Sequence, residues 1–461
     1  MTKNAGAADD SRTAALRTAV QALMPQAKSD LTELVSFKSV YDERQFPIEE
    51  CHKAAQWVAD AFAAEGLTDV GLHETADGSQ AVVASRPGPP GAPHVLLYCH
   101  YDVQPPLNEN AWRTPVWQLT EQNGRWYGRG AADCKGNIVM HLTALRALRQ
   151  LGGGDYPVGL TLIAEGSEEQ GTGGLEDFVP KHADLLRADA IVVADCGNFA
   201  VGTPTFTETL RGTVNVVVTV ETLASEMHSG MFGGAAPDAL AALIHLLATL
   251  RDADGNTTVA GLTNDQKWDG VQYPEAQFRS DAGVLDGVDL VGSGSIADML
   301  WARPALTVLG IDAPKVVGSA AAIQPRAAAR LNLRIPPGTD PQQALKALTA
   351  HLESNTPWHA KVTVEKESTG SPFRSGTGGP ARSAMEQAFA ASYGREATTM
   401  GQGGSIPLCN VFADTYPDAE IMLIGVEEPT CLIHAPNESV DPTEIEHMAL
   451  AEALFLASYT R

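Results

Sequence analysis

The run His94-Val95-Leu96-Leu97-Tyr98-Cys99 is almost wholly apolar and ends abruptly in the polar cluster His100-Tyr101-Asp102. Two later runs have the same form. Residues 159–164 lead into Glu165-Gly166-Ser167-Glu168-Glu169, and residues 190–194 lead into Asp195-Cys196-Gly197. Continuous apolar runs of this length are typical of strands buried on both faces of a sheet that helices cover. The sequence therefore predicts an α/β domain with a mixed, mainly parallel sheet.

Acids and histidines gather at these predicted strand ends, which is the edge where open parallel sheets bind ligands. With two segments from elsewhere in the chain, the set is His100, Asp102, Asp133, Glu168, Glu169, Asp195 and His434. Two imidazoles with several carboxylates suit zinc, manganese or cobalt. So many carboxylates in one cleft would repel one another without bound cations. Taken singly, each residue also has a plainer interpretation, because a lone His is often a packing residue and an Asp often caps a turn.

The rest of the chain predicts a second domain inserted into the first. Apolar residues have helical spacing in 16–36 and 48–65, before the first strand. After residue 205, a strand (214–220), a helix (237–250), an alternating strand (330–335) and a further strand (362–365) indicate a small α+β domain with an antiparallel sheet. The Gly/Ser/Pro-rich stretch 368–380 is interpreted as a return linker, and 421–424 as another buried strand. We predict a catalytic domain from residues 1–205 and 381–461, with residues 206–380 as the insertion.

Composition limits the classes of function. The chain has 461 residues, 44% of them hydrophobic and 19% charged, which is the balance of a soluble globular protein of more than one domain. A net charge of −24 argues against nucleic acid as a partner. We see no signal peptide and no membrane-spanning stretch. Six cysteines do not form a disulfide framework in a chain of this length, so we expect a cytoplasmic protein.

Six strings in this sequence resemble the dinuclear metallopeptidase family that includes carnosinase, carboxypeptidase G, the aminoacylases and the desuccinylases. They occur in the family's order over nearly the whole chain: His100-Tyr101-Asp102-Val103-Gln104-Pro105, Gly128-Arg129-Gly130-Ala131-Ala132-Asp133-Cys134-Lys135-Gly136, Glu165-Gly166-Ser167-Glu168-Glu169, His228-Ser229-Gly230, Gly403-Gly404-Ser405-Ile406-Pro407 and His434-Ala435-Pro436-Asn437-Glu438.

The resemblance implies a role for each residue of the metal site. Asp133 would bridge two divalent ions, most simply zinc with manganese or cobalt as alternatives, so that both polarise a shared water. His100 and Asp195 would complete one metal site, and Glu169 and His434 the other. Asp102 lies two residues after His100, on the same side of an extended segment, and can fix the tautomer of that imidazole. Glu168 would be the general base that activates the bridging water.

The resemblance also implies roles within the insertion. In relatives the histidine matching His228 reaches the active site of a partner subunit and stabilises the oxyanion, which would make the insertion a lid and the route to a homodimer. A surface histidine beside a Gly-rich turn is the alternative. Arg334 is a candidate for binding the substrate's C-terminal carboxylate, with Arg330 and Arg326 as competitors. Ser405 is a candidate for the same carboxylate.

One departure from the family pattern concerns cysteine. Many relatives have a second acid after the bridging aspartate, and this chain has Cys134 there. Cys99, Cys134 and Cys196 each adjoin a predicted ligand. One of these cysteines could bind zinc as a thiolate. Neighbours on an extended strand point to opposite faces, however, which favours the cysteines as small apolar side chains packed in the core.

The strings favour a dipeptidase of the carnosinase-like branch, acting on the amide bond of small peptides. An N-acyl-amino-acid deacylase or desuccinylase would use the same metal site and differ only in the pocket. A binding protein that kept the fold and lost catalysis is a more distant alternative. The presence of all the predicted ligands and of Glu168 argues against it.

Overall fold

The chain forms two compact units in the computed structural model, which describes residues 2–460 and the side chains from residue 11 onward. Unit 1 comprises the chain up to Glu208, then Ser375–Met400, then the chain from Leu408. Unit 2 comprises Thr209–Arg374 and Gly401–Pro407. The segment 401–407, which the sequence analysis assigned to the catalytic part, is thus grouped with unit 2. Among the described helices, none has both the length and the apolar composition needed to cross a membrane.

Unit 1 is built around a mixed sheet. Its strands lie in the order β1-β2-β6-β3-β7-β17-β8, with β6, β3, β7 and β17 mutually parallel and the outer pairs antiparallel. The elements that carry this unit are α1 (Thr2–Ser36), α2 (Glu49–Ala64), β1 (Asp69–Glu74), β2 (Gln80–Arg86), β3 (His94–His100), η1 (Glu109–Ala111), β4 (Thr120–Gln122), β5 (Arg125–Tyr127), α3 (Lys135–Leu151), β6 (Gly159–Glu165), η2 (Glu168–Gln170), α4 (Gly174–Lys181), β7 (Ala190–Ala194), β8 (Thr205–Leu210), α9 (Pro380–Tyr393), β16 (Thr398–Gln402), α10 (Pro407–Thr415), β17 (Glu420–Ile424), η5 (Pro429–Cys431), β18 (Ser439–Val440) and α11 (Pro442–Ser458).

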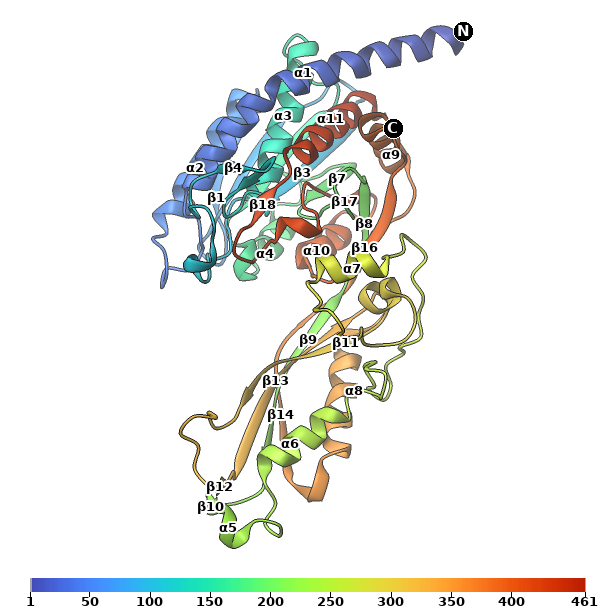
Figure 1. The fold of residues 1–461 in the computed structure, drawn as a ribbon. Helices are drawn as coiled ribbons and strands as arrows, with labels where there is room; N and C mark the ends of the chain where they lie inside the picture. Colours follow the sequence, from blue (N-terminus) through green and yellow to red (C-terminus); the bar gives the residue numbers. More distant parts are fainter. Residues whose placement is uncertain (1, 461) are drawn as a thin grey trace. The chain divides into compact units, whose positions relative to one another are not determined.

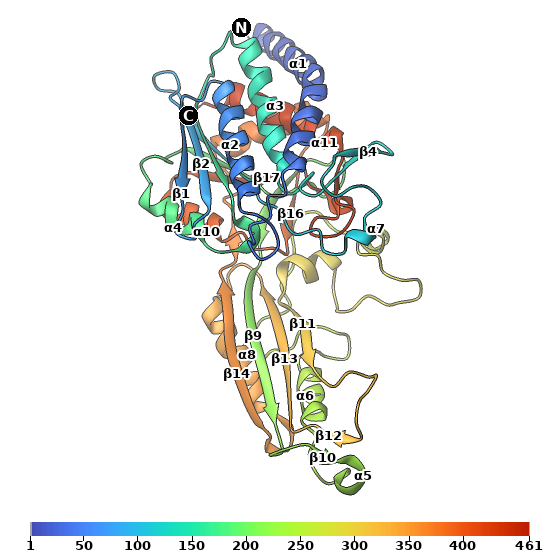
Figure 2. The ribbon, with the colours of Figure 1, turned by 90° about the vertical axis from the view of Figure 1, so that its left-hand side faces the viewer.

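Both faces of this sheet are covered, which explains the apolar runs. Alternate residues of β3, such as Leu97 and Cys99, belong to the core formed with α1, α2, α3 and α11. Tyr98 points to the opposite face and meets Phe412 of α10, with ring centroids 6.3 Å apart. Figures 1 and 2 show α1, α3 and α11 side by side on the sheet. A strand between two helical layers has no solvent-exposed face and needs no polar alternation.

Unit 2 is an antiparallel sheet in the order β11-β13-β9-β14. Val214, Val216, Val218 and Val220 alternate along β9 and pack against α6 and α8, whereas the intervening residues form the other face. The elements are β9 (Gly212–Glu221), β10 (Met227–His228), α5 (Ser229–Phe232), α6 (Ala239–Ala248), α7 (Glu275–Asp281), η3 (Asp298–Ala302), β11 (Ala305–Asp312), β12 (Ala322–Ile323), β13 (Arg326–Ile335), α8 (Pro341–Ser354), η4 (Pro357–His359), β14 (Lys361–Gly370) and β15 (Phe373–Arg374).

The predicted fold class is confirmed: a mixed, largely parallel central sheet accompanies a separate antiparallel sheet. The interpretation of 368–380 as a linker is wrong in its first half. β14 continues to Gly370, and β15 pairs Phe373 with Leu210. Backbone pairing with β9 continues beyond a register shift between Lys366 and Ser368, so ladder hydrogen bonds outweigh the low strand propensity of Gly and Ser.

Candidate metal centre

The predicted ligands of unit 1 meet at one edge of its sheet. His100 is the last residue of β3, Glu169 lies in η2 directly after β6, and Asp195 follows β7. These three strands are parallel neighbours, so their carboxyl ends lie together. Asp133 comes from the loop before α3, and His434 from the segment after η5.

His100 faces two carboxylates with one nitrogen and Asp102 with the other. Its Nδ1 lies 3.1 Å from the Asp102 carbonyl oxygen and 3.3 Å from the Asp102 carboxylate, so Nδ1 carries a hydrogen and donates it. Nε2 lies 3.0 Å from Asp133 Oδ1 and 3.1 Å from Asp195 Oδ1. A proton on Nε2 or a metal cation between these atoms would balance the two anionic oxygens that face this nitrogen.

His434 faces the other carboxylate oxygen of Asp133. Its Nε2 lies 3.0 Å from Asp133 Oδ2 and 3.1 Å from Glu169 Oε2. Burial lowers the pKa of His434, but its hydrogen bonds to Asp133 and Glu169 outweigh burial and raise that pKa to about 11. The two oxygens of Asp133 therefore face two different imidazoles.

The donor groups fit two divalent cations that share Asp133. The oxygens of Asp133 and Glu169 lie with a ring nitrogen of His434 within 4.8 Å of one another, and Asp195 lies in a second group with His100. Nitrogen and carboxylate donors in these numbers suit zinc, manganese or cobalt. Burial raises the pKa of Glu169 to about 7, with Asp133 adding to the effect. Bound cations would reverse that penalty, because they stabilise the ionised carboxylate.

Asp102 connects the imidazole of His100 to the loop that carries Glu168. Asp102 is buried, and its two carboxylate oxygens accept the backbone N–H groups of Glu168 and Glu169 at 3.2 and 3.0 Å. Burial first, and then Asp195, raise the pKa of Glu168 well above its usual value. A glutamate with a raised pKa beside groups that can bind metal is a candidate general base.

The sequence analysis missed Glu438, which shapes the loop before Asp133. Glu438 is buried and accepts hydrogen bonds from the backbone N–H groups of Gly130, Ala132 and Asp133. It also accepts a hydrogen bond from Arg129 Nη1 at 2.6 Å. Pairing of β18 with β5 brings the residues after His434 to this loop. The only sequence signal was that Glu438 ends one of the family strings.

Gln104 is a second residue that the sequence analysis passed over. Its backbone N–H donates to Glu169 Oε1 at 3.2 Å, and its side-chain amide donates to Glu169 Oε2 at 2.8 Å. Both oxygens of the Glu169 carboxylate are thus oriented by one residue. Supporting hydrogen bonds of this kind orient carboxylate ligands in metal sites.

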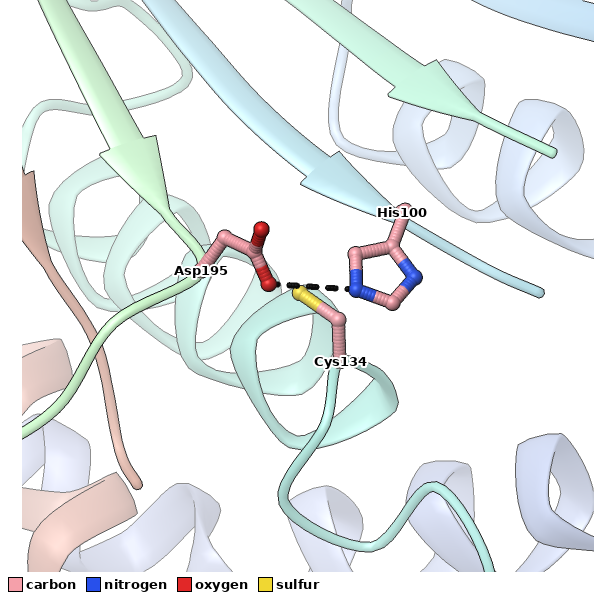
Figure 3. Close-up of side chains that lie close together, drawn as sticks. All are labelled: His100, Cys134 and Asp195. Atoms are coloured by element: carbon pink, nitrogen blue, oxygen red, sulfur yellow. Dashed lines mark hydrogen bonds and ion pairs between the residues drawn. The ribbon is translucent and has the colours of Figure 1, made fainter. Parts of the chain in front are cut away.

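Of the three cysteines considered, only Cys134 lies with predicted metal ligands (Figure 3). Its Sγ is within 4.8 Å of a ring nitrogen of His100 and a carboxylate oxygen of Asp195. The Cys134 thiol donates to the Ala194 carbonyl oxygen at 2.9 Å, and burial raises the pKa of Cys134 to about 12. Both observations describe a protonated thiol in the metal-free protein, as expected of a small apolar side chain that fills space in the core.

His228, Arg334 and Ser405 belong to unit 2. His228 is exposed, and its Nδ1 accepts a hydrogen bond from the Gly230 N–H at 3.1 Å, so the neutral ring carries its hydrogen on Nε2. Among the arginines of β13, Arg330 pairs with Glu367 at 2.7 Å and Arg326 donates to Thr219. The guanidinium of Arg334 has neither an ion pair nor a hydrogen bond with any described residue.

Arg211, in unit 2, is a further cation that the sequence analysis did not consider. It is 9% exposed, and among the described residues its Nε and Nη1 have no hydrogen-bond acceptor. Burial lowers the pKa of Arg211 to about 10, with the charge of Arg334 adding to the effect. The turn containing Ser405 passes close by, since a Cβ added at Gly403 would lie 2.9 Å from Arg211 Nη2. Two neighbouring guanidinium groups with no acidic partner among the described residues are a candidate anion site.

Comparisons with known proteins agree with this geometry. Residues 96–458 match peptidase family M20/M25/M40. A cysteinylglycine-S-conjugate dipeptidase of Corynebacterium striatum is 42% identical over 443 residues, which cover 95% of this chain and 97% of that protein. A Beta-Ala-His dipeptidase of Rattus norvegicus is 28% identical over 428 residues, covering 87% and 86%. The crystal structure of human carnosine dipeptidase 1 superposes with a TM-score of 0.81 at 25% identity, covering 96% and 98% of the two chains.

The resemblance inferred from the six strings is therefore confirmed, including its dipeptidase branch. The family match spans the sheet edge where the two imidazoles face the shared carboxylate of Asp133. This chain belongs to peptidase family M20/M25/M40 and is a metallodipeptidase of that family.

Proposed function

We propose that this enzyme hydrolyses unblocked dipeptides at a centre of two divalent ions bridged by Asp133, and that S-substituted cysteinylglycine is among its substrates. The observation that carries the proposal is the placement of the two Asp133 oxygens, each 3.0 Å from the Nε2 atom of a different imidazole. The substrate class comes from the Corynebacterium striatum relative.

His100 and Asp195 hold one ion in this proposal, and Glu169 and His434 hold the other, with Asp133 common to both. The nitrogen and oxygen donors fit zinc, with manganese or cobalt as alternatives. When bound, the two ions supply Lewis acidity to the scissile carbonyl and to the attacking water.

Glu168 is the proposed general base. It takes a proton from the attacking water and returns it to the leaving amine, and a raised pKa makes its carboxylate a stronger base for this transfer. Asp102 holds the backbone of Glu168 through a hydrogen bond of 3.2 Å. The base is therefore fixed relative to His100, whose Nδ1 lies 3.3 Å from the same Asp102 oxygen.

Arg334 is the proposed partner of the substrate's C-terminal carboxylate, together with Ser405 and the neighbouring Arg211. Arg330 and Arg326 are weaker candidates, because both side chains already have partners. A free dipeptide supplies the anion that the two guanidinium groups lack. Arg334→Lys is expected to raise KM for dipeptides more than it lowers kcat. Arg330→Lys, its control on the same strand face, is expected to leave KM unchanged.

A homodimer through unit 2 is the proposed assembly. β11 is an edge strand that presents Val308, Leu309 and Ile311 with exposed fractions of 39%, 52% and 46%. An exposed apolar edge is a template for pairing with another chain. The proposed role of His228 is to donate its Nε2–H to the oxyanion of the partner's site.

Mixing two inactive variants tests this assignment. His228→Ala subunits and Glu168→Gln subunits are expected to regain activity when they exchange, because each mixed dimer assembles one intact site. Exchange without rescue would mean that His228 acts within its own chain or not at all.

The proposed compartment is the cytoplasm. All six cysteines are free and buried, which fits a reducing environment.

Hydrolysis assays separate the dipeptidase proposal from the deacylase alternative. The panel comprises cysteinylglycine, an S-substituted cysteinylglycine, other unblocked dipeptides, N-acetyl and N-succinyl amino acids, and a tripeptide. Turnover of the free dipeptides with little turnover of the acylated compounds is expected. A preference for acylated amino acids would overturn the substrate proposal and leave the metal centre intact. Glu168→Gln should lose ~100-fold or more in kcat on every substrate that is cleaved while retaining its metal content.

A further inference from the structure

Glu427 is a buried carboxylate beside the proposed metal ligands. It follows β17 and is 7% exposed. One of its carboxylate oxygens lies with an oxygen of Asp133 and an oxygen of Asp195 inside a group whose atoms are all within 4.8 Å of one another. The sequence analysis gave this residue no role, because it belongs to none of the six strings.

The position of Glu427 is fixed from two sides. Its carbonyl oxygen accepts a hydrogen bond from the Asn198 N–H at 2.7 Å. Its Oε1 accepts a hydrogen bond from the side-chain amide of Asn137 at 2.5 Å, and Asn137 Oδ1 in turn accepts from the Val426 N–H at 2.9 Å. Glu427 is thus held by the first turn of α3, directly after the loop that carries Asp133.

The second oxygen of this carboxylate, Oε2, is buried and has no hydrogen-bond partner among the described residues. Within those residues no lysine, arginine or histidine forms an ion pair with Glu427. The backbone makes room for this oxygen: a Cβ at Gly425 would lie 2.5 Å from Oε2 and 2.0 Å from the Cys196 carbonyl oxygen. An unpaired buried carboxylate oxygen is costly unless a cation satisfies it.

We propose that Glu427 is a further carboxylate donor to the ion held by Asp133 and Asp195, and that it favours an oxygen-preferring ion such as Mn²⁺ over Zn²⁺. This inference rests on the proposed two-metal centre and adds a donor to it. His100, Asp133 and Asp195 supply one nitrogen and two carboxylates, which suffice for a zinc site with an open fourth position. Manganese prefers more oxygen ligands in an octahedral arrangement, and Glu427 supplies one more.

Metal titration of the full-length protein tests the proposal. Glu427→Gln keeps an acceptor for Asn137 and the shape of the side chain, and removes the charge. The matched control is Glu452→Gln. Glu452 is also buried with one oxygen unpartnered among the described residues, but it pairs with His141 and belongs to none of the metal-binding groups. Mn²⁺ binding is measured from the electron paramagnetic resonance of free Mn²⁺, and Zn²⁺ binding by competition with a chromogenic chelator. Thermal unfolding confirms that each variant is folded.

The expected result is a Kd for Mn²⁺ at least tenfold weaker in Glu427→Gln, with a change below threefold for Zn²⁺. Glu452→Gln is expected to change neither value. An unchanged Kd for Mn²⁺ in folded Glu427→Gln would overturn the proposal. Equal weakening of both ions would overturn it too, because Glu427 would then act through packing or general charge. Failure of the wild-type protein to bind either ion would instead refute the metal centre itself.

Discussion

Glu438 is the residue whose replacement should reveal how the loop before Asp133 is held. Its two carboxylate oxygens together accept four hydrogen bonds. Oε1 accepts the N–H groups of Ala132 and Asp133, both at 3.1 Å, and Oε2 accepts the Gly130 N–H at 3.0 Å and Arg129 Nη1 at 2.6 Å. Burial raises the pKa of Glu438, but because every partner donates, the group serves as an ionised acceptor.

In Glu438→Gln the side-chain amide nitrogen must replace one of these oxygens, so two buried donors lose their acceptor whichever way the amide turns. Each unsatisfied donor costs about 1–3 kcal/mol. Arg129, which is 1% exposed, also loses its counter-charge. Removing one partner of a buried ion pair costs about 3–5 kcal/mol, which agrees with the sum over two donors. We expect the free energy of unfolding to fall by about that amount, and metal affinity to fall ~10–100-fold because Asp133 loses its support.

Urea unfolding followed by tryptophan fluorescence, with a metal titration of the folded variant, measures both effects. Glu428→Gln is the matched control. Glu428 is also buried and pairs with an arginine, Arg125, but makes no hydrogen bond to residues 129–133. The control should lose stability and keep its metal affinity. Wild-type unfolding and wild-type metal affinity in Glu438→Gln would refute the reasoning, since four hydrogen bonds would then contribute nothing.

Three further outcomes are expected. Asp102→Asn should lower kcat ~10–100-fold, because the asparagine has one carboxamide oxygen in place of the two oxygens that accept the N–H groups of Glu168 and Glu169. An unchanged kcat in steady-state kinetics would contradict this. Metal binding should tighten as pH rises towards 11 and release protons, because Asp133 and Glu169 raise the pKa of His434 to about 11 in the metal-free protein and the ion must displace that proton. Calorimetry in buffers of different ionisation heat measures the release, and binding without it would show that His434 is not protonated before the ion binds. Gln104→Leu should weaken metal binding and change the melting temperature by no more than a few degrees, since the side-chain amide contacts only Glu169. Equal metal affinity in the wild-type protein and the variant would show that Gln104 does not support the metal site.

The sequence predicted the sheet and brought the proposed ligands to its edge for a simple physical reason. The positions of His100, Glu169 and Asp195 follow from three parallel strands, whose ends coincide once the strands are neighbours. The sequence does not determine the order of the strands by itself. The six strings, through the family they resemble, supplied the two ligands that come from loops, Asp133 and His434.

The residues that support the ligands could not be predicted from the sequence. Glu438 and Asp133 are 305 residues apart in the chain and meet only through the fold. Strand alternation placed Arg330 and Arg334 on the same face and could not rank them. The ranking depends on Glu367 of β14, which pairs with Arg330 of β13 although β9 lies between the two strands. Glu427 lies outside every string, and it is distinguished by a buried, unpartnered oxygen together with its position beside Asp133 and Asp195.

The proposed metal ligands and the proposed general base share one support, Asp102, which limits how far the two functions can vary independently. Asp102 accepts the N–H groups of both Glu168 and Glu169 and faces the Nδ1 atom of His100. A change that moved Asp102 would therefore displace a ligand of each metal ion and the general base together. Gln104 and Glu438, by contrast, each support one ligand, Glu169 and Asp133 respectively. Metal preference can thus change through these outer residues while the geometry of base and imidazole is preserved.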